Sequence, residues 1–161
     1  MNPLHLSRGA LAMRLSAAVL AMAPLSLAAA PQTGSSDRRA IEVLLDSYTR
    51  CVTQHDEAGF RALLLDDAIP FAAVGPSTAS IRSPDLRQYE GFRQAVFARG
   101  QRYRQTFSNV HIEQHGVLAQ VSLDFVTEQV SPHRGSSAGW KVLQLVRVGE
   151  RWKIASELFV F

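Results

Sequence analysis

Cysteine is almost absent from this chain of 161 residues, in which Cys51 is the single example. One cysteine cannot form an intramolecular disulfide, so the fold has to be held together by its apolar core. Cys51 falls on or beside the apolar face of a predicted helix. This position favours a buried, unreactive thiol over a reactive one.

Acidic residues are absent from the first 30 positions. His5, Arg8 and Arg14 make a basic start, and residues 15–30 follow without a charge and end in small side chains. The apolar run is shorter than the roughly 20 residues that a membrane span needs. We therefore interpret residues 1–30 as a cleaved signal peptide, with a retained N-terminal anchor as the alternative. Cleavage would leave a periplasmic or secreted protein that is not attached to a membrane.

The surplus of positive charge is small once this leader is removed. Without Arg8 and Arg14, 15 basic residues face 14 acidic ones, so the pI of about 9.5 belongs partly to the leader. Arginines cluster locally between Arg87 and Arg104, which is typical of the solvent face of a helix and the strand that follows it. This balance of charge gives no reason to expect a nucleic-acid partner.

Several catalytic and cofactor motifs are also missing. The sequence contains no glycine-rich phosphate loop, no CxxC, no HExxH and no GxSxG. Of the five histidines, His111 and His115 are four positions apart, but they lie on or next to a predicted strand and not on a helix. We therefore predict neither a metal site nor a cofactor.

Hydrophobic periodicity divides the chain into early helices and late strands. Residues 31–36 (PQTGSS) are typical of a flexible lead-in, and one domain is predicted over 37–161. Apolar steps of three and four residues, together with capping residues, predict helices over 37–55, 56–65 and from Ser83-Pro84-Asp85 to Gly100. Strands are predicted over 69–74, 103–114, 117–129, 140–148 and 152–161, with turns at Gly116 and Gly149. Segregated helices and strands of this kind indicate the α+β class.

Three stretches carry a resemblance to a known family. They are YTRCVTQHDEAGFRALLLDDA (Tyr48 to Ala68), LRQYEGFRQAV, and VLQLVRVGERWKIASELF, which contains "W+I" from Trp152 to Ile154. In this order they resemble the nuclear transport factor 2-like superfamily, which includes SnoaL-like polyketide cyclases and ketosteroid isomerases. The resemblance implies a strongly curved, cone-shaped antiparallel sheet that wraps three N-terminal helices around an apolar pocket. It also implies a homodimer formed through the sheet.

The resemblance further implies three positions for ketosteroid-isomerase chemistry. Tyr48 matches the tyrosine that binds the oxyanion. The carboxylate base is expected near Ala72 and a protonated aspartate at Gln144, and neither position holds an acid. Two of the three groups therefore differ, which argues against this particular reaction.

Candidate site residues follow from the pattern and the resemblance together. The catalytic candidates are Tyr48, His111 and Glu157, although the face of the strand on which Glu157 lies stays open. The candidates for ligand binding are Tyr48, Phe60, Phe92, Phe125 and Gln144. The three phenylalanines could equally be plain core. Gln144 alternates with Trp140, Val142 and Val146, so we expect this row to face inward, with Gln144 either contacting a ligand or bonded within the protein.

Three functions remain open from the sequence. The first is an exported domain that binds a small apolar or aromatic molecule in the cone. The second is a SnoaL-like enzyme, an isomerase, cyclase or dehydratase, that uses Tyr48 with a histidine or glutamate in the pocket. The third is a dimeric interaction protein, which exposure of Leu143, Leu145 and Leu158 would support.

Overall fold

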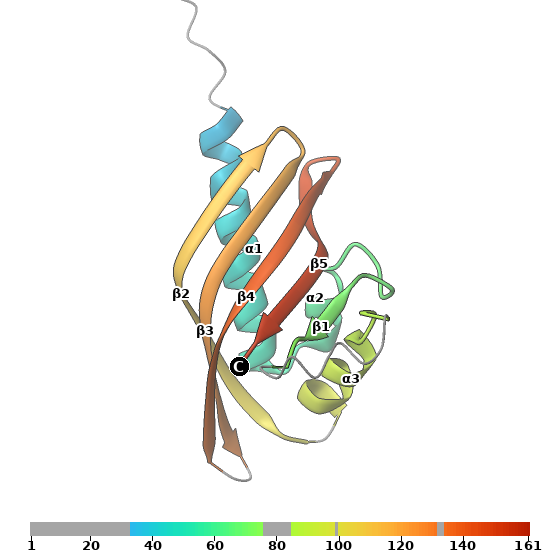
Figure 1. Ribbon diagram of the computed structural model, residues 1–161, viewed down its shortest axis with the longest axis vertical. Coiled ribbons are helices and arrows are strands. Elements are labelled where there is room, and N and C mark those ends of the chain that lie inside the picture. Colours follow the sequence, from blue (N-terminus) through green and yellow to red (C-terminus); the bar gives the residue numbers. More distant parts are fainter. Residues whose placement is uncertain (1–32, 76–84, 99, 132–133) are drawn as a thin grey trace, which may run out of the picture. The chain divides into compact units, whose positions relative to one another are not determined.

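The computed structural model describes residues 33–75, 85–98, 100–131 and 134–161. The predicted leader and Ser83-Pro84 lie outside these residues. The predicted helix start at Ser83-Pro84-Asp85 is wrong, because residues 85–88 are described and are not helical, and the helix begins at Tyr89. Within the unit Pro31–Phe161, the helices precede the long strands in the chain (Figure 1). No helix among the described residues is long and apolar enough to span a membrane.

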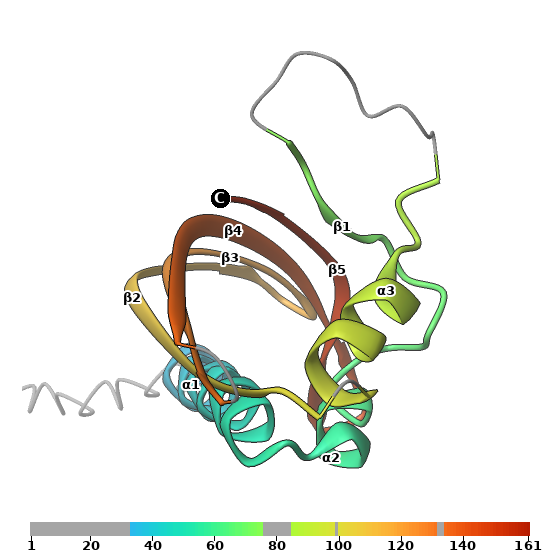
Figure 2. The same ribbon diagram turned by 90° about the horizontal axis from the view of Figure 1, so that it is seen from below.

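A five-stranded sheet is the largest element of this unit. Its strands are β1 (Phe71–Ala73), β2 (Arg102–His115), β3 (Leu118–Ser131), β4 (Gly135–Val148) and β5 (Arg151–Val160), in the order β1-β5-β4-β3-β2. All neighbours are antiparallel except β1 and β5, which are parallel. The sheet is curved and unclosed (Figure 2), which confirms the predicted α+β class and cone.

The helices lie along the concave side of the sheet (Figure 2). They are α1 (Thr33–Gln54), α2 (Glu57–Arg61) and α3 (Tyr89–Arg93), and α3 continues into a π-helical segment, η1 (Gln94–Ala98). A predicted cap at Asp56 is confirmed, because its carboxylate accepts a hydrogen bond of 2.8 Å from the backbone N–H of Gly59.

The start of α1 differs from the prediction. The helix begins at Thr33, inside the segment expected to be a flexible lead-in. Asp37, the predicted first residue of this helix, lies inside it, and its carboxylate accepts hydrogen bonds from Gln114 Nε2 at 2.9 Å and Arg147 Nη1 at 3.1 Å. These contacts join the first turns of α1 to β2 and β4.

Turns and bulges set which side chains face the helices. Gly116 and Gly149 have φ values of 59° and 61°, which confirms the two predicted hairpin turns. β5 also carries an extra residue, Ala155, between the residues that pair with Leu145 and Gln144. A bulge shifts the alternation by one position. Trp152 and Ile154 before it and Glu157 after it are therefore all buried on the same face.

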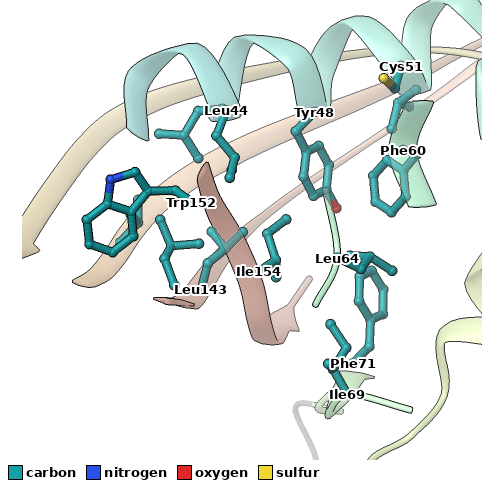
Figure 3. Close-up of a cluster of buried hydrophobic side chains, with 14 of the residues drawn as sticks. Leu44, Tyr48, Cys51, Phe60, Leu64, Ile69, Phe71, Leu143, Trp152 and Ile154 are labelled. Atoms are coloured by element: carbon teal, nitrogen blue, oxygen red, sulfur yellow. The ribbon is translucent and has the colours of Figure 1, made fainter. Parts of the chain in front are cut away.

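The core fills the space between α1, α2 and the inner face of the sheet (Figure 3). Trp152 is buried there beside Leu44 and Leu143, which confirms its predicted role as a marker of the fold. Cys51 is buried as predicted. Leu143 and Leu145 are fully buried, so the exposed leucines that would have supported the interaction-protein hypothesis are not found at these positions.

Candidate functional site

The buried row of β4 is the opposite of the one expected. Lys141, Leu143 and Leu145 point into the molecule, whereas Trp140 is 48% exposed and Gln144 is exposed. Side chains alternate strictly along a strand, so an error of one position reverses every side chain. The apolar character of Trp140 favoured the wrong face.

Lys141 is the central residue of a buried polar cluster. It is 2% exposed, and its Nζ donates hydrogen bonds to Glu157 Oε1 at 2.7 Å and to the Tyr48 hydroxyl at 2.9 Å. The Tyr48 hydroxyl in turn donates to the same Glu157 oxygen at 2.8 Å. Two of the three catalytic candidates are thus brought together, by a lysine that the sequence reasoning missed.

Aromatic rings surround the ammonium group of Lys141. Its Nζ lies 4.5 Å from the ring centroid of Tyr48, 4.8 Å from that of Phe125, 5.4 Å from that of Phe107 and 5.5 Å from that of Phe159. Cation–π attraction partly offsets the loss of hydration that a buried charge suffers. α1, β2, β3 and β5 each contribute one ring.

Burial shifts the protonation equilibria of two members of this cluster. Loss of hydration lowers the pKa of Lys141, while the Glu157 carboxylate acts in the opposite direction. Burial is also the main cause that raises the pKa of Tyr48 well above its usual value, and Glu157 adds to this rise. Tyr48 therefore stays protonated, and so a hydrogen-bond donor, over the physiological pH range. The Lys141 ammonium loses its proton more readily than that of a solvent-exposed lysine.

Lys141 and Glu157 of this cluster contribute to the wall of a cavity of about 390 Å³, whereas Tyr48 is fully buried behind it. The cavity lies between the inner face of the sheet, β1 and the α3–η1 segment, and six of its lining residues are aromatic: Phe71, Phe92, Tyr103, Phe125, Phe159 and Phe161. Lys141, Glu157 and Gln105 supply polar groups to the wall. Small-ligand sites share this size and this mainly apolar lining with a few placed polar groups.

Two buried acceptor atoms of residues in this wall have no hydrogen-bond partner among the described residues. They are Glu157 Oε2 and Gln105 Oε1. The amide nitrogen of Gln105 already has a partner, since Nε2 donates a hydrogen bond to Thr127 Oγ1 at 2.9 Å. An unmet buried acceptor costs about 1–3 kcal/mol, which a bound hydrogen-bond donor would relieve.

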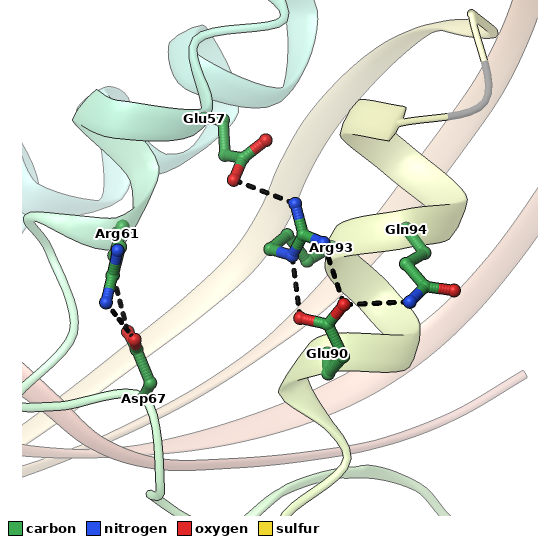
Figure 4. A network of polar contacts seen from close by, with 6 residues as sticks. All are labelled: Glu57, Arg61, Asp67, Glu90, Arg93 and Gln94. Atoms are coloured by element: carbon green, nitrogen blue, oxygen red, sulfur yellow. Dashed lines mark hydrogen bonds and ion pairs between the residues drawn. The ribbon is translucent and has the colours of Figure 1, made fainter.

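Ion pairs fix the helical side of the cavity (Figure 4). Arg93 of α3 bonds both carboxylate oxygens of Glu90 at 2.7 Å and also reaches Glu57 Oε1 of α2 at 3.1 Å. Arg93 is the main cause that lowers the pKa of Glu90 to about 2. Arg61 and Asp67 form a separate pair nearby. The network joins α3, which carries part of the cavity wall, to α2.

The predicted phenylalanines divide into two groups. Phe92 and Phe125 line the cavity, and ligand binding by them stays a prediction. Phe60 is fully buried behind it, with its ring centroid 4.7 Å from that of Tyr48, and belongs to the core. Gln144 lies on the outer face, where it accepts a hydrogen bond of 3.0 Å from Ser156 Oγ, so its expected place in the cone pocket is wrong.

His111 does not reach the cavity either. The pairing of β2 with β3 shifts between Ser108 and His111, and Asn109 in this bulge has a φ of 50°. The bulge leaves His111 exposed and opposite Ser122, while Ile112 turns toward the helices. Its expected position as a base in the pocket is therefore wrong.

The position where the family resemblance implies a base does lie at the cavity. Ala72 is buried in the wall, and its neighbour Phe71 pairs with Glu157 of β5. The carboxylate at this part of the cavity is therefore that of Glu157, on the adjacent strand β5.

The sequence contained one sign that Lys141 is buried, because this charged residue alternates with Leu143 and Leu145. That sign could be interpreted only once it was known which face of β4 is buried.

Other candidate sites on the described residues are weaker. A depression of about 610 Å³ near Arg104, Glu128 and Arg134 is larger, but it has no aromatic residue in its wall and contains none of the buried groups described above. The described residues include no group of three or more histidine, cysteine, aspartate or glutamate side chains that could hold a metal ion.

Comparison with known proteins agrees with this architecture. The sequence profile of the SnoaL-like domain matches residues 34–156, so the chain belongs to the SnoaL-like family. The cone fold and the family motifs together place it in the nuclear transport factor 2-like superfamily. No curated protein matches the chain.

Three solved structures illustrate the fold. An NTF2-like protein with a cystatin-like fold from Novosphingobium aromaticivorans is 20% identical, with 87% of this chain and 91% of that chain covered and a TM-score of 0.61. A candidate scytalone dehydratase from the same organism is 17% identical (80% and 85% covered, TM-score 0.61). An NTF2-like superfamily protein from Salmonella enterica is 12% identical (78% and 91% covered, TM-score 0.58). At these identities the likeness extends to the fold alone.

Proposed function

We propose that this chain binds a small, largely apolar molecule that carries a polar group, in the cavity above Lys141 and Glu157. The observation that supports this most is the combination of an aromatic cavity of about 390 Å³ with buried polar groups in its wall. A purely structural core would gain more from packing apolar side chains into this space. The apolar walls would contribute affinity, and the polar groups would select the ligand.

The polar group of the ligand should be a hydrogen-bond donor or a carbonyl. A hydroxyl could donate to Glu157 Oε2 or Gln105 Oε1, the two acceptors without a partner among the described residues. A carbonyl oxygen could accept from Lys141 Nζ. Aromatic or alicyclic alcohols, phenols, aldehydes and ketones meet both requirements.

A binding titration with 2-naphthol as the probe tests this proposal. We expect saturable binding to the purified protein, followed by the shift in melting temperature and by native mass spectrometry. At a probe concentration 100 times the dissociation constant, the stabilisation should be about 2.7 kcal/mol. Ala95→Phe should fill the cavity and abolish binding, because Ala95 lines its wall. Ala98→Phe, on the same segment but exposed, is the matched control and should bind as the parent does.

Two results would count against the proposal. The first is the absence of any binding by 2-naphthol and related phenols and ketones. The second is binding that Ala95→Phe leaves unchanged, because the probe would then occupy another surface.

A second candidate is an acid–base enzyme in the same cavity, and Glu157 Oε2 is the observation that favours it. A carboxylate oxygen without a partner among the described residues can take up a proton from a substrate, while the Lys141 ammonium in the cavity wall stabilises developing negative charge. The structural likeness to a candidate scytalone dehydratase gives limited support. Proton exchange in 2-tetralone dissolved in D2O, followed by NMR, measures this activity directly. A rate equal to that of buffer alone would exclude proton abstraction from this ketone.

We also propose that the protein acts outside the cytoplasm. Support comes from the basic start and uncharged run of residues 1–30. N-terminal sequencing of the protein recovered from the periplasm or the medium should find a new N-terminus near residue 30. Recovery of the intact chain from the cytoplasm would overturn this part of the proposal.

A further inference from the structure

We propose that Lys141 captures aldehyde or ketone ligands covalently, as a reversible imine on its Nζ. This inference rests on the proposed function, since the carbonyl compound must first enter the same cavity. It goes further by assigning a covalent step, a nucleophile and a chemical class of ligand.

The position of the Lys141 nitrogen supports the proposal. Lys141 lies in the wall of the cavity, so a carbonyl compound bound there would lie beside this side chain, which is 2% exposed. An ammonium group has three N–H donors. Glu157 and Tyr48 accept two hydrogen bonds from Nζ, which leaves one position on the nitrogen from which a new bond can form.

The ring cluster around Nζ holds the amine in place. Four aromatic rings lie within 5.5 Å of it, measured to their centroids. Immobilising the nucleophile beside a bound ligand removes much of the entropic barrier to a two-molecule reaction. The same apolar surroundings disfavour the charged amine, in agreement with the lowered pKa of Lys141.

Glu157 can carry the protons that imine formation requires. The Lys141 ammonium first transfers a proton to the Glu157 carboxylate, whose oxygen lies 2.7 Å away, so the pair stays neutral overall. The free amine turns about its Cε–Nζ bond, which directs the new lone pair away from Glu157 toward the cavity, and it attacks the carbonyl carbon to form a carbinolamine. The departing oxygen takes one proton from the nitrogen and one from Glu157 and leaves as water. The products are a protonated imine, a Glu157 carboxylate and one water molecule, so atoms and charge balance without any oxidant.

Tyr48 has a positioning role in this scheme. Its hydroxyl accepts from Lys141 Nζ and donates to Glu157 Oε1, which fixes the two reacting groups against each other. Its raised pKa keeps it protonated.

The composition of the chain supplies an internal control. It contains two lysines, Lys141 and Lys153. Lys153 is only half-buried on β5, where its Nζ donates to the backbone carbonyl of Ala62, and it does not line the cavity. An aldehyde that reacts with any accessible lysine, without first binding in the cavity, should therefore modify Lys153 as well.

Reductive trapping tests the proposal. The purified protein is incubated with 2-naphthaldehyde and sodium cyanoborohydride, which reduces an imine to a stable secondary amine, and peptide mass spectrometry locates the adduct. We expect about tenfold or more adduct at Lys141 than at Lys153, because binding raises the effective concentration of the aldehyde. An excess of 2-naphthol should suppress the Lys141 adduct and leave reaction at Lys153 unchanged.

The outcomes separate this inference from the proposed function. If 2-naphthol binds in the cavity but adducts form equally at the two lysines, or at neither, imine formation is overturned and the binding function stands. If 2-naphthol does not bind and Lys141 is not modified, both are overturned. Lys141→Arg adds a second check, since it keeps the positive charge but cannot form an imine, and it should lose the adduct while the Lys153 background persists.

Discussion

Substitution of either member of the buried Lys141–Glu157 pair should destabilise the protein strongly. The two side chains are 2% and 0% exposed, and 2.7 Å separates Lys141 Nζ from Glu157 Oε1. Lys141→Met would leave a carboxylate buried with only Tyr48 to bond, and Glu157→Gln would leave an ammonium buried with no carboxylate. Removing one partner of such a pair costs about 3–5 kcal/mol, mainly because the remaining charge is uncompensated.

The double variant Lys141→Met/Glu157→Gln separates this explanation from simple loss of packing. It leaves no unpaired charge, so its cost should be about 1–3 kcal/mol less than the sum of the two single costs. Equilibrium unfolding in urea, followed by the fluorescence of buried Trp152, measures all four proteins. The slope of free energy against urea should stay the same in each, as expected for a shared two-state transition.

An exposed ion pair serves as the control for this cycle. Arg61 and Asp67 bond each other on the surface, so Arg61→Gln should change the unfolding free energy little. The reasoning is refuted if the single substitutions of the buried pair cost less than about 1 kcal/mol each and their effects add, because the two groups would then behave like surface charges.

Three further predictions concern stability. Gly139→Ala should destabilise the protein by about 1–3 kcal/mol in urea unfolding, because a Cβ there would clash with the Val160 carbonyl and the Phe125 ring, whereas Gly135→Ala should be nearly neutral. Because burial raises the pKa of Tyr48, its contribution to stability is complete below the unfolded value near pH 10, and it is lost as the pH rises from there through the raised folded pKa. Tyr48→Phe should therefore flatten the alkaline decline in unfolding free energy. Deletion of residues 159–161 should lower stability by about 2 kcal/mol or more, and an unchanged melting temperature would contradict the packing of Phe159 against Phe71.

Much of the fold could be predicted because its signals are local. Ala119, Val121, Leu123 and Phe125 alternate along β3 and are all buried, as their spacing predicts. The two hairpin turns require a positive φ angle, which glycine adopts easily, so the positions of these turns could also be predicted. These signals depend only on near neighbours in the sequence.

The candidate site could be predicted only in part, because bulges decide which residues reach it. The extra residue Ala155 turns Glu157 inward, and the bulge at Asn109 turns His111 outward. A shift of one residue reverses the face of every side chain beyond it, and no local sequence signal marks these two positions. The inward position of Lys141 depends on the same kind of register, set by pairing with strands distant in the sequence.

A crystal structure of the protein grown with 2-naphthol would show whether the cavity binds a small aromatic alcohol. We expect the probe inside the cavity among Phe92, Phe125 and Phe159, with its hydroxyl within hydrogen-bond distance of Glu157 Oε2 or Gln105 Oε1. A cavity filled by the protein's own side chains, or a probe bound only elsewhere, would contradict this expectation.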